Sequence, residues 1–163
     1  MTDAARRAAM ALLVGLGLAG CGSGAPGPAG NHAQAQLEAS ARVGDVIVRA
    51  NAVPTASLGE AVARQYGIER SNGTVMLLVG VRRDDGNGNE TALPARVAAV
   101  ATDLLGKRQQ PAMREVRSGE FIDYVGTASV IAPDTLRFDI DITVEGGPAM
   151  ELHFNRDFFP DRP

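Results

Sequence analysis

The sequence predicts an all-β fold, an antiparallel immunoglobulin-like β-sandwich of about seven strands with one short helix. From residue 42 onward, short runs of β-branched and other apolar residues alternate with clusters of Gly, Pro, Asn and Asp at near-regular spacing. No alternation of strands with long helices is present, which argues against a parallel sheet. Residues 42–163 have the length of one domain, and this pattern is typical of a sandwich.

The first predicted strand covers residues 42–50, and the helix follows it. Ser57 and Glu60 have the spacing of a capping box, with apolar residues at helical spacing behind them. Gly67 followed by Ile68 predicts a Schellman end, because a helix terminus favours a left-handed residue followed by an apolar contact.

The middle of the domain reads as strands joined by polar turns. Residues 74–82 are apolar on both faces, which predicts a central strand. Pro94 places the start of the predicted strand 91–102 at a sheet edge or bulge, because proline cannot donate to a ladder. Residues 113–117 and 120–128 predict a hairpin that turns at Ser118-Gly119.

The last hairpin has the clearest alternation, in residues 136–144 and 150–155. Because opposed residues share a face, matching the apolar sets pairs Val144 with Met150 and Ile142 with Leu152 across a Gly-Gly-Pro turn. The same register opposes Asp141 to His153 on the polar face.

The amino terminus has the pattern of an export signal. Arg6 and Arg7 precede an apolar run of about 12 residues, too short for a membrane-spanning helix of roughly 20. The run ends in Leu18-Ala19-Gly20-Cys21, which resembles the lipobox of bacterial lipoproteins. That resemblance implies that residues 1–20 are a signal peptide and that Cys21 is lipidated.

The segment at 21–41 is rich in Gly, Ala, Pro, Ser and Gln, which predicts a flexible tether between the anchor and the domain. Gly22, in place of an aspartate after the cysteine, favours the outer over the inner membrane. We therefore expect a lipid-anchored, periplasm-facing protein of the cell envelope.

The inventory of reactive groups argues against an enzyme. Lipidation occupies the single cysteine, and His153 is the only histidine in the predicted domain, on a polar strand face. With 16 Lys and Arg against 19 Asp and Glu, the chain lacks the basic footprint of a nucleic-acid binder. We expect no cofactor.

The alternative is a metal-dependent or hydrolytic enzyme on the polar face of the last hairpin. Its candidate metal ligands are Asp139, Asp141, Glu151 and His153. An open strand face, however, would not enclose a metal ion held by these side chains. A third interpretation is a purely structural envelope lipoprotein.

Several stretches, in order, resemble a family of exported bacterial proteins known as domain of unknown function 4426. They are Asn51-Ala52 to Leu58, Val62-Ala63, Tyr66-Gly67-Ile68, Arg70-Ser71, Asp103-Leu104-Leu105-Gly106, Arg114-Glu115-Val116, Tyr124, 135–140, and 154–159. The chain departs from the family at Arg49-Ala50, where His-Tyr is usual, and at Asp103, where asparagine is usual. The resemblance implies an envelope-located β-domain and no known activity.

These observations predict a non-enzymatic binding module that contacts the membrane through its anchor and an envelope protein through its domain. One candidate surface is an exposed sheet edge that pairs with a partner strand. The other is a recognition loop made of Tyr66, Gly67, Ile68, Arg70 and Ser71, whose alternative interpretation is ordinary packing at a Schellman helix end.

Overall fold

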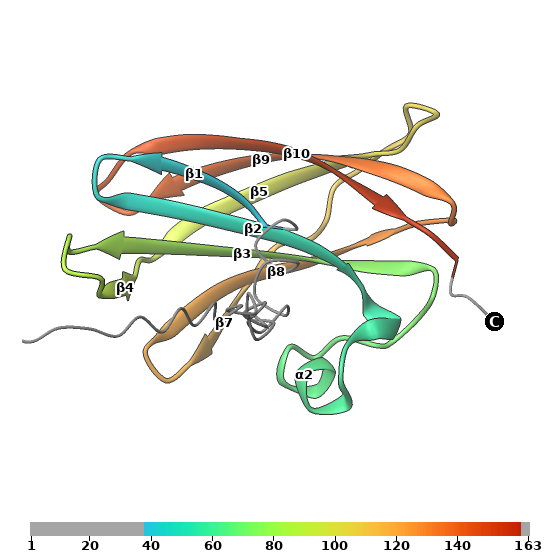
Figure 1. The fold of residues 1–163 in the computed structure, drawn as a ribbon, viewed down its shortest axis with the longest axis horizontal. Helices are drawn as coiled ribbons and strands as arrows, with labels where there is room; N and C mark the ends of the chain where they lie inside the picture. The colour runs from blue at the N-terminus through green and yellow to red at the C-terminus, as the bar shows by residue number, and fades with distance from the viewer. Residues whose placement is uncertain (1–37, 161–163) are drawn as a thin grey trace, which may run out of the picture.

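The computed structural model describes residues 38–160, which form ten strands in two antiparallel sheets (Figure 1). Sheet A has the order β1-β2-β3-β8-β7, with β4 also paired to β3, and sheet B has the order β10-β9-β5-β6. The strands of sheet A are β1 (Ala39–Val43), β2 (Val46–Pro54), β3 (Thr74–Asp84), β4 (Glu90–Ala92), β7 (Arg114–Ser118) and β8 (Phe121–Ser129). Those of sheet B are β5 (Ala95–Thr102), β6 (Arg108–Gln109), β9 (Asp134–Val144) and β10 (Ala149–Phe158).

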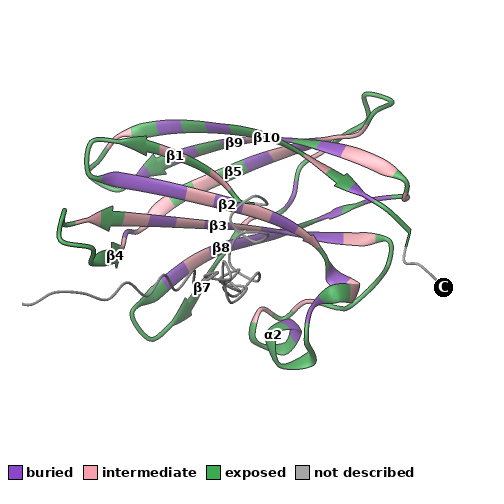
Figure 2. Ribbon diagram, in the orientation of Figure 1, coloured by how far each residue is buried: buried purple, intermediate pink, exposed green. Residues whose placement is uncertain are grey.

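The core lies between the two sheets, where residues buried in the ribbon alternate with exposed ones along the long strands (Figure 2). The alternation is clearest in β9, whose apolar residues are buried while most of the polar residues between them are exposed. Phe138 of β9 stacks on Phe154 of β10, with ring centroids 5.0 Å apart. The largest fully buried side chains are Phe138, Leu77, Leu136, Ile140, Ile142, Val48, Val75, Val79, Val81 and Val125.

The predicted antiparallel sandwich is confirmed, but the strand count is ten rather than seven. The predicted strand 42–50 is a hairpin, because Gly44 has a positive φ of 61° and turns β1 into β2. β1 thus begins at Ala39, ahead of the predicted boundary at residue 42. The two-residue strand β6 was too short to give a sequence signal.

The predicted strand 91–102 is two strands that lie in different sheets. β4 pairs with β3 in sheet A, and β5 pairs with β9 in sheet B. Leu93 still donates its N–H to Val81 of sheet A (3.0 Å), whereas the carbonyl of Pro94 accepts from Glu145 beside sheet B (3.0 Å). The chain therefore crosses between sheets at Pro94, the residue that has no N–H for a ladder.

The last hairpin forms as predicted, but its register differs by two residues. Met150 pairs with Ile142 rather than Val144, and His153 pairs with Asp139 rather than Asp141. The turn is tighter than the prediction assumed, because Val144 donates its N–H to Pro148 (3.1 Å) and the N–H of Gly147 bonds back to Val144 (3.1 Å). A shift of two leaves every side chain on its predicted face, so the apolar pattern could not distinguish the two registers.

The predicted helix consists of a 3-10 turn, η1 (Thr55–Ser57), and the short helix α2 (Glu60–Gln65). The capping box is wrong: the N-cap is Gly59, and the Ser57 hydroxyl instead donates to the carbonyl of Pro54 (2.7 Å). The Schellman end is confirmed, since Ile68 donates to Ala63 (2.8 Å) and Gly67 to Arg64 (3.1 Å), with φ of 57° at Gly67.

Residues 55–73, which include η1 and α2, form an excursion between β2 and β3 that covers one end of the outer face of sheet A (Figure 1). A second, smaller apolar cluster holds it there, formed by Leu58, Ala63, Met76 and Val125 with Val53, Tyr66, Ile68, Leu78 and Val116. Within residues 38–160, no helix has the length and apolar content to cross a membrane.

Candidate functional site

Three sets of polar contacts shape the excursion: two join its own residues and one ties it to sheet A. The Thr55 hydroxyl, which is fully buried, accepts from the Ser71 N–H (2.9 Å) and donates to the Ser71 carbonyl (3.1 Å). Arg70 donates to the carbonyl of Ala56 (2.9 Å). From the end of α2, the Tyr66 hydroxyl donates to a carboxylate oxygen of Asp123 on β8 (3.0 Å).

Where this segment meets strands β7 and β8, it leaves an open groove of about 410 Å³, which we call the loop groove. Its lining residues are Gly67, Ile68, Glu69, Ser71, Thr74, Ala112, Arg114, Val125, Gly126 and Thr127. Arg114 lies at the start of β7, and its guanidinium passes close to Gly67: a Cβ there would be 3.5 Å from one of its nitrogens. A Cβ at residue 67 would be in ordinary contact with the arginine, so the left-handed helix end is what requires glycine here.

Arg114 is exposed, and no hydrogen bond or ion pair engages its side chain in the part of the chain that the structure describes. The hydroxyls of Thr74 and Thr127 are likewise without a hydrogen bond among the described residues. A cation beside two hydroxyl donors is suited to an anionic group such as a carboxylate or phosphate. Glu69 gives the opposite rim of the groove a negative charge.

The floor of the groove depends on Gly126. A Cβ at this position would lie 2.5 Å from the Met113 sulfur and 3.0 Å from Cβ of Pro111, because the segment before β7 packs directly over β8. Arg114 directly follows that segment. Because residue 126 has no side chain, the segment can lie close to β8, and this fixes how near Arg114 comes to that strand.

The structure divides the predicted recognition loop into two kinds of residue. Gly67, Ile68 and Ser71 line the loop groove, whereas Tyr66 and Arg70 hold the segment in place through Asp123 and Ala56. The sequence interpretation missed the opposite wall of the groove. Arg114 lies far along the chain from the loop, although it belongs to one of the stretches that carry the family resemblance.

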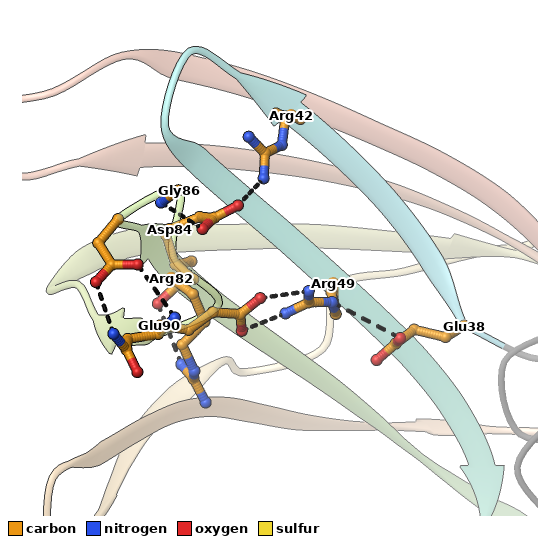
Figure 3. A network of polar contacts seen from close by, with 10 residues as sticks. Glu38, Arg42, Arg49, Arg82, Asp84, Gly86 and Glu90 are labelled. Carbon is orange, nitrogen blue, oxygen red and sulfur yellow. Dashed lines mark hydrogen bonds and ion pairs between the residues drawn. The ribbon is translucent and has the colours of Figure 1, made fainter.

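A second polar cluster covers the other end of the outer face of sheet A (Figure 3). Arg49 on β2 makes a two-pronged ion pair with Glu90 on β4, with both N–O distances at 2.6 Å, and lies 3.9 Å from Glu38. The hydrogen bonds from Arg49 hold the pKa of Glu90 below its usual value, and Glu90 raises the pKa of Arg49. Arg42 pairs with Asp84 at the edge of this cluster.

Arg82 links this cluster to the covered end of the sheet. Its guanidinium donates to Asp123 (2.8 Å) and to the carbonyl of Ile122 (2.7 Å), and it lies 5.9 Å from the ring centroid of Phe121. Burial raises the pKa of Tyr66, and the neighbouring Asp123 raises it further. A depression of about 230 Å³ lies among these groups, but its charges are paired with one another, so the cluster holds strands and hairpins together.

The last hairpin places its polar residues on the outer face of sheet B. His153 Nδ1 is 3.0 Å from Asp139 and its Nε2 is 3.6 Å from Glu151, with 57% of the His153 side chain exposed. Hydrogen bonds from Arg137, and secondarily the contact with His153, hold the pKa of Asp139 below its usual value. Asp141 pairs with Glu151 instead of His153.

Among residues 38–160, no three His, Cys, Asp or Glu side chains are grouped so that they could hold a metal ion. In the observed register, two of the predicted ligands, Asp141 and His153, are no longer opposite each other. Cys21 and the lipobox residues Leu18, Ala19 and Gly20 lie outside the described residues.

Comparison with known structures yields relatives of the same architecture. A crystal structure of a DUF4426 family protein, PA0388 from Pseudomonas aeruginosa PAO1, matches with a TM-score of 0.65 and 29% identity, covering 78% of this chain and 98% of that one. FetP of uropathogenic Escherichia coli, expressed in the periplasm, matches with a TM-score of 0.54 and 10% identity, covering 75% and 95%.

A copper-bound variant of FetP matches similarly, with a TM-score of 0.53, 10% identity and the same coverage. At this identity, the likeness to FetP shows a shared fold. No curated protein matches the chain. The model of the domain of unknown function DUF4426 matches residues 40–161, from β1 to the end of the described sandwich. The chain therefore belongs to the DUF4426 family.

Proposed function

We propose that this protein is a lipid-anchored, non-enzymatic binding module of the bacterial envelope, and that the loop groove is its ligand site. The amino-terminal pattern ending in Cys21 supports the anchor. The structural likeness to FetP, which was recombinantly expressed in the periplasm, is consistent with a location in the envelope.

The observation that carries the binding site is the unpartnered guanidinium of Arg114 beside unbonded hydroxyls in an open groove. The polar cluster around Arg49 and Arg82 differs in this respect, because its arginines are paired with carboxylates. An arginine that the fold leaves without an acceptor is available for an acceptor on a ligand. We assign the groove to an acidic group of an envelope partner.

The histidine and carboxylates of the last hairpin support a non-enzymatic function. Arg137 holds Asp139 ionised, which makes its carboxylate a weak base, and His153 faces open solvent. General acid–base catalysis is most effective when the pKa of the group lies near the working pH and water is excluded. Asp139 does not meet the first condition, and the open surroundings of His153 do not meet the second.

Site-specific photo-crosslinking in the lipidated full chain tests the assignment. With the crosslinker at Glu69 in the loop groove, we expect one discrete product. The same crosslinker at Glu151, on the outer face of sheet B, is the matched control and should not give that product. Arg114→Glu should reduce the Glu69 product roughly tenfold or more, as expected for reversal of a charge that binds a ligand acceptor.

Identical products from positions 69 and 151, or a Glu69 product that is unchanged by Arg114→Glu, would contradict the groove as the binding site. Arg114→Lys separates charge from geometry. Because lysine keeps the charge but loses the planar fork, partial recovery of the product indicates recognition of an anion.

A further inference from the structure

Four large apolar side chains are exposed together at one end of the sandwich. Leu104 is 72% exposed, Leu105 95%, Ile131 87% and Phe159 73%. They lie at the end where β5, β8 and β10 finish and β9 begins, on the right of Figure 1. We call this set the apolar end.

Contacts between the loops bring these residues to the same end of the sandwich. The Leu104 N–H lies 3.4 Å from the carboxylate of Asp134, the first residue of β9, and Asp134 pairs with Phe158 next to Phe159. Ile131 and Phe159 line the same apolar depression of about 520 Å³. Exposed apolar residues scattered singly need no explanation, but a group of this kind indicates an interaction surface.

The loop that carries the two leucines is held in shape by its own hydrogen bonds. The Asp103 carboxylate accepts from the N–H groups of Leu105 (3.0 Å) and Lys107 (2.8 Å). Gly106 closes the turn with a positive φ of 84° and an N–H bond to the Asp103 carbonyl (3.0 Å). The leucines are thus presented at the tip of an ordered turn, away from the core.

Two basic side chains follow the leucines and are available, whereas the carboxylate that precedes them, Asp103, is held by its own loop. Lys107 and Arg108 follow directly, and neither side chain has an ion pair or hydrogen bond in residues 38–160. The carboxylates of this end are engaged: Asp103 and Asp134 accept backbone N–H groups of their loops, and Asp157 accepts from Thr135. Apolar side chains beside free basic ones are the combination that adsorbs to an anionic bilayer surface.

The length of chain between the proposed anchor and the domain allows this contact. The span from Cys21 to Glu38 is 17 peptide steps by number, which reaches at most about 60 Å when fully extended. The longest strands have 11 residues, or roughly 36 Å at the usual rise. An anchored domain can therefore place either end on the bilayer that holds it.

We propose that the apolar end is a membrane-contact surface that places Leu104 and Leu105 in the interfacial layer of an anionic lipid bilayer, with Lys107 and Arg108 against the headgroups. This inference rests on the proposed lipid anchor. It implies that the domain lies on its membrane in a fixed orientation.

The test uses the lipidated full chain in vesicles of phosphatidylcholine and phosphatidylglycerol. The chain has one cysteine, which the lipid blocks, so an environment-sensitive fluorophore can be attached to Leu105→Cys alone. The matched control is Glu120→Cys, in the exposed turn between β7 and β8 at the other end of the sandwich. Flotation with the vesicles reports the anchor, and fluorescence reports the contact.

We expect the label at position 105 to shift to an apolar emission and to become roughly threefold less accessible to an aqueous quencher, as interfacial burial requires. The label at position 120 should stay in water. Reversing both charges with Lys107→Glu and Arg108→Glu should return the label at 105 to water, whereas Arg96→Glu, another exposed basic residue without an ion pair, should not.

A chain that floats while both labels remain in water overturns the membrane contact and leaves the anchor intact. A chain that does not float contradicts the anchor and the contact together. A shift of the label at 105 in the absence of vesicles shows that the apolar end binds another protein or a second copy, and also overturns the proposal.

Discussion

Thr55 and Ser71 are joined by two hydrogen bonds through a single hydroxyl group. Thr55 Oγ1 accepts from the Ser71 N–H at 2.9 Å and donates to the Ser71 carbonyl at 3.1 Å, and Thr55 is fully buried. This pair closes the excursion between β2 and β3 at its base. The position of the loop groove therefore depends on a residue that does not line it.

Replacing the hydroxyl by a methyl group tests this closure. Thr55→Val keeps the volume but leaves the N–H and carbonyl of Ser71 without their partner, which costs about 1–3 kcal/mol in free energy of unfolding. Thr55→Ser keeps the hydroxyl and should cost less. Urea unfolding measures both variants. Equal stability of Thr55→Val and the parent would contradict the closure.

Gly67 is expected to be sensitive to substitution because of its backbone. Gly67→Ala forces a side chain into the left-handed region at φ of 57°, a cost of about 1–2 kcal/mol. Gly73→Ala is the matched control, since its φ lies outside that region and a Cβ there would meet only ordinary contacts at 3.8 Å or more, and it should leave the free energy of unfolding unchanged or raise it by up to about 1 kcal/mol. Thermal unfolding measures the stability of both variants. Equal losses of stability would exclude backbone strain at Gly67 as the cause.

The Arg49–Glu90 pair predicts a stability effect that depends on pH. Because Arg49 lowers the pKa of Glu90 in the folded protein, the pair stabilises the fold above the ordinary glutamate pKa, and this contribution is lost as the pH falls through the lowered value. Both side chains are about one-third exposed, so we expect Arg49→Gln to cost about 0.5–1 kcal/mol at pH 7.

The cost of Arg49→Gln should shrink as the pH falls from 7 through the lowered pKa of Glu90, because the Glu90 carboxyl then protonates in both proteins. Denaturant unfolding over this pH range measures the change. Arg64→Gln serves as the control, since Arg64 makes a highly exposed pair with Glu60. A cost for Arg49→Gln that does not change with pH would contradict the pair as its origin.

The two tyrosines are the only ones in the chain, and both should ionise late. Burial is the main cause that raises the pKa of Tyr66 and of Tyr124, and the carboxylate of Asp123 adds to the effect at Tyr66. Asp123→Asn should therefore lower one of the two phenol midpoints. Alkaline titration of the phenolate absorbance measures it, with Glu90→Gln as the control. If neither phenol midpoint changes, Asp123 does not contribute to the raised pKa of Tyr66.

The sequence predicts strands and faces well where one residue pattern determines them. The alternation in β9 and β10 follows directly from the residues, and so does the helix end at Gly67. Register does not, because a shift by two residues keeps every apolar side chain inward. The separation of β4 from β5 was not predicted either. A proline indicates a break in a strand, but it does not indicate which sheet the residues after it join.

The sequence predicted one wall of the loop groove and not the other. The loop residues Gly67 to Ser71 form one continuous stretch, whereas Arg114 meets them only because β7 pairs with β8, and β8 with β3. Such non-local pairing leaves no local pattern. The apolar end likewise gathers Leu104, Ile131 and Phe159 from three separate loops.

Lipidation of Cys21 would fix this protein in the envelope, and mass analysis of the mature amino-terminal peptide from the bacterial membrane is its sharpest test. We expect a peptide that begins at Cys21 and carries diacylglyceryl and N-acyl groups, and we expect Cys21→Ser to abolish them. A membrane-extracted chain that still contains residues 1–20, or that begins at an unmodified Cys21, would contradict it.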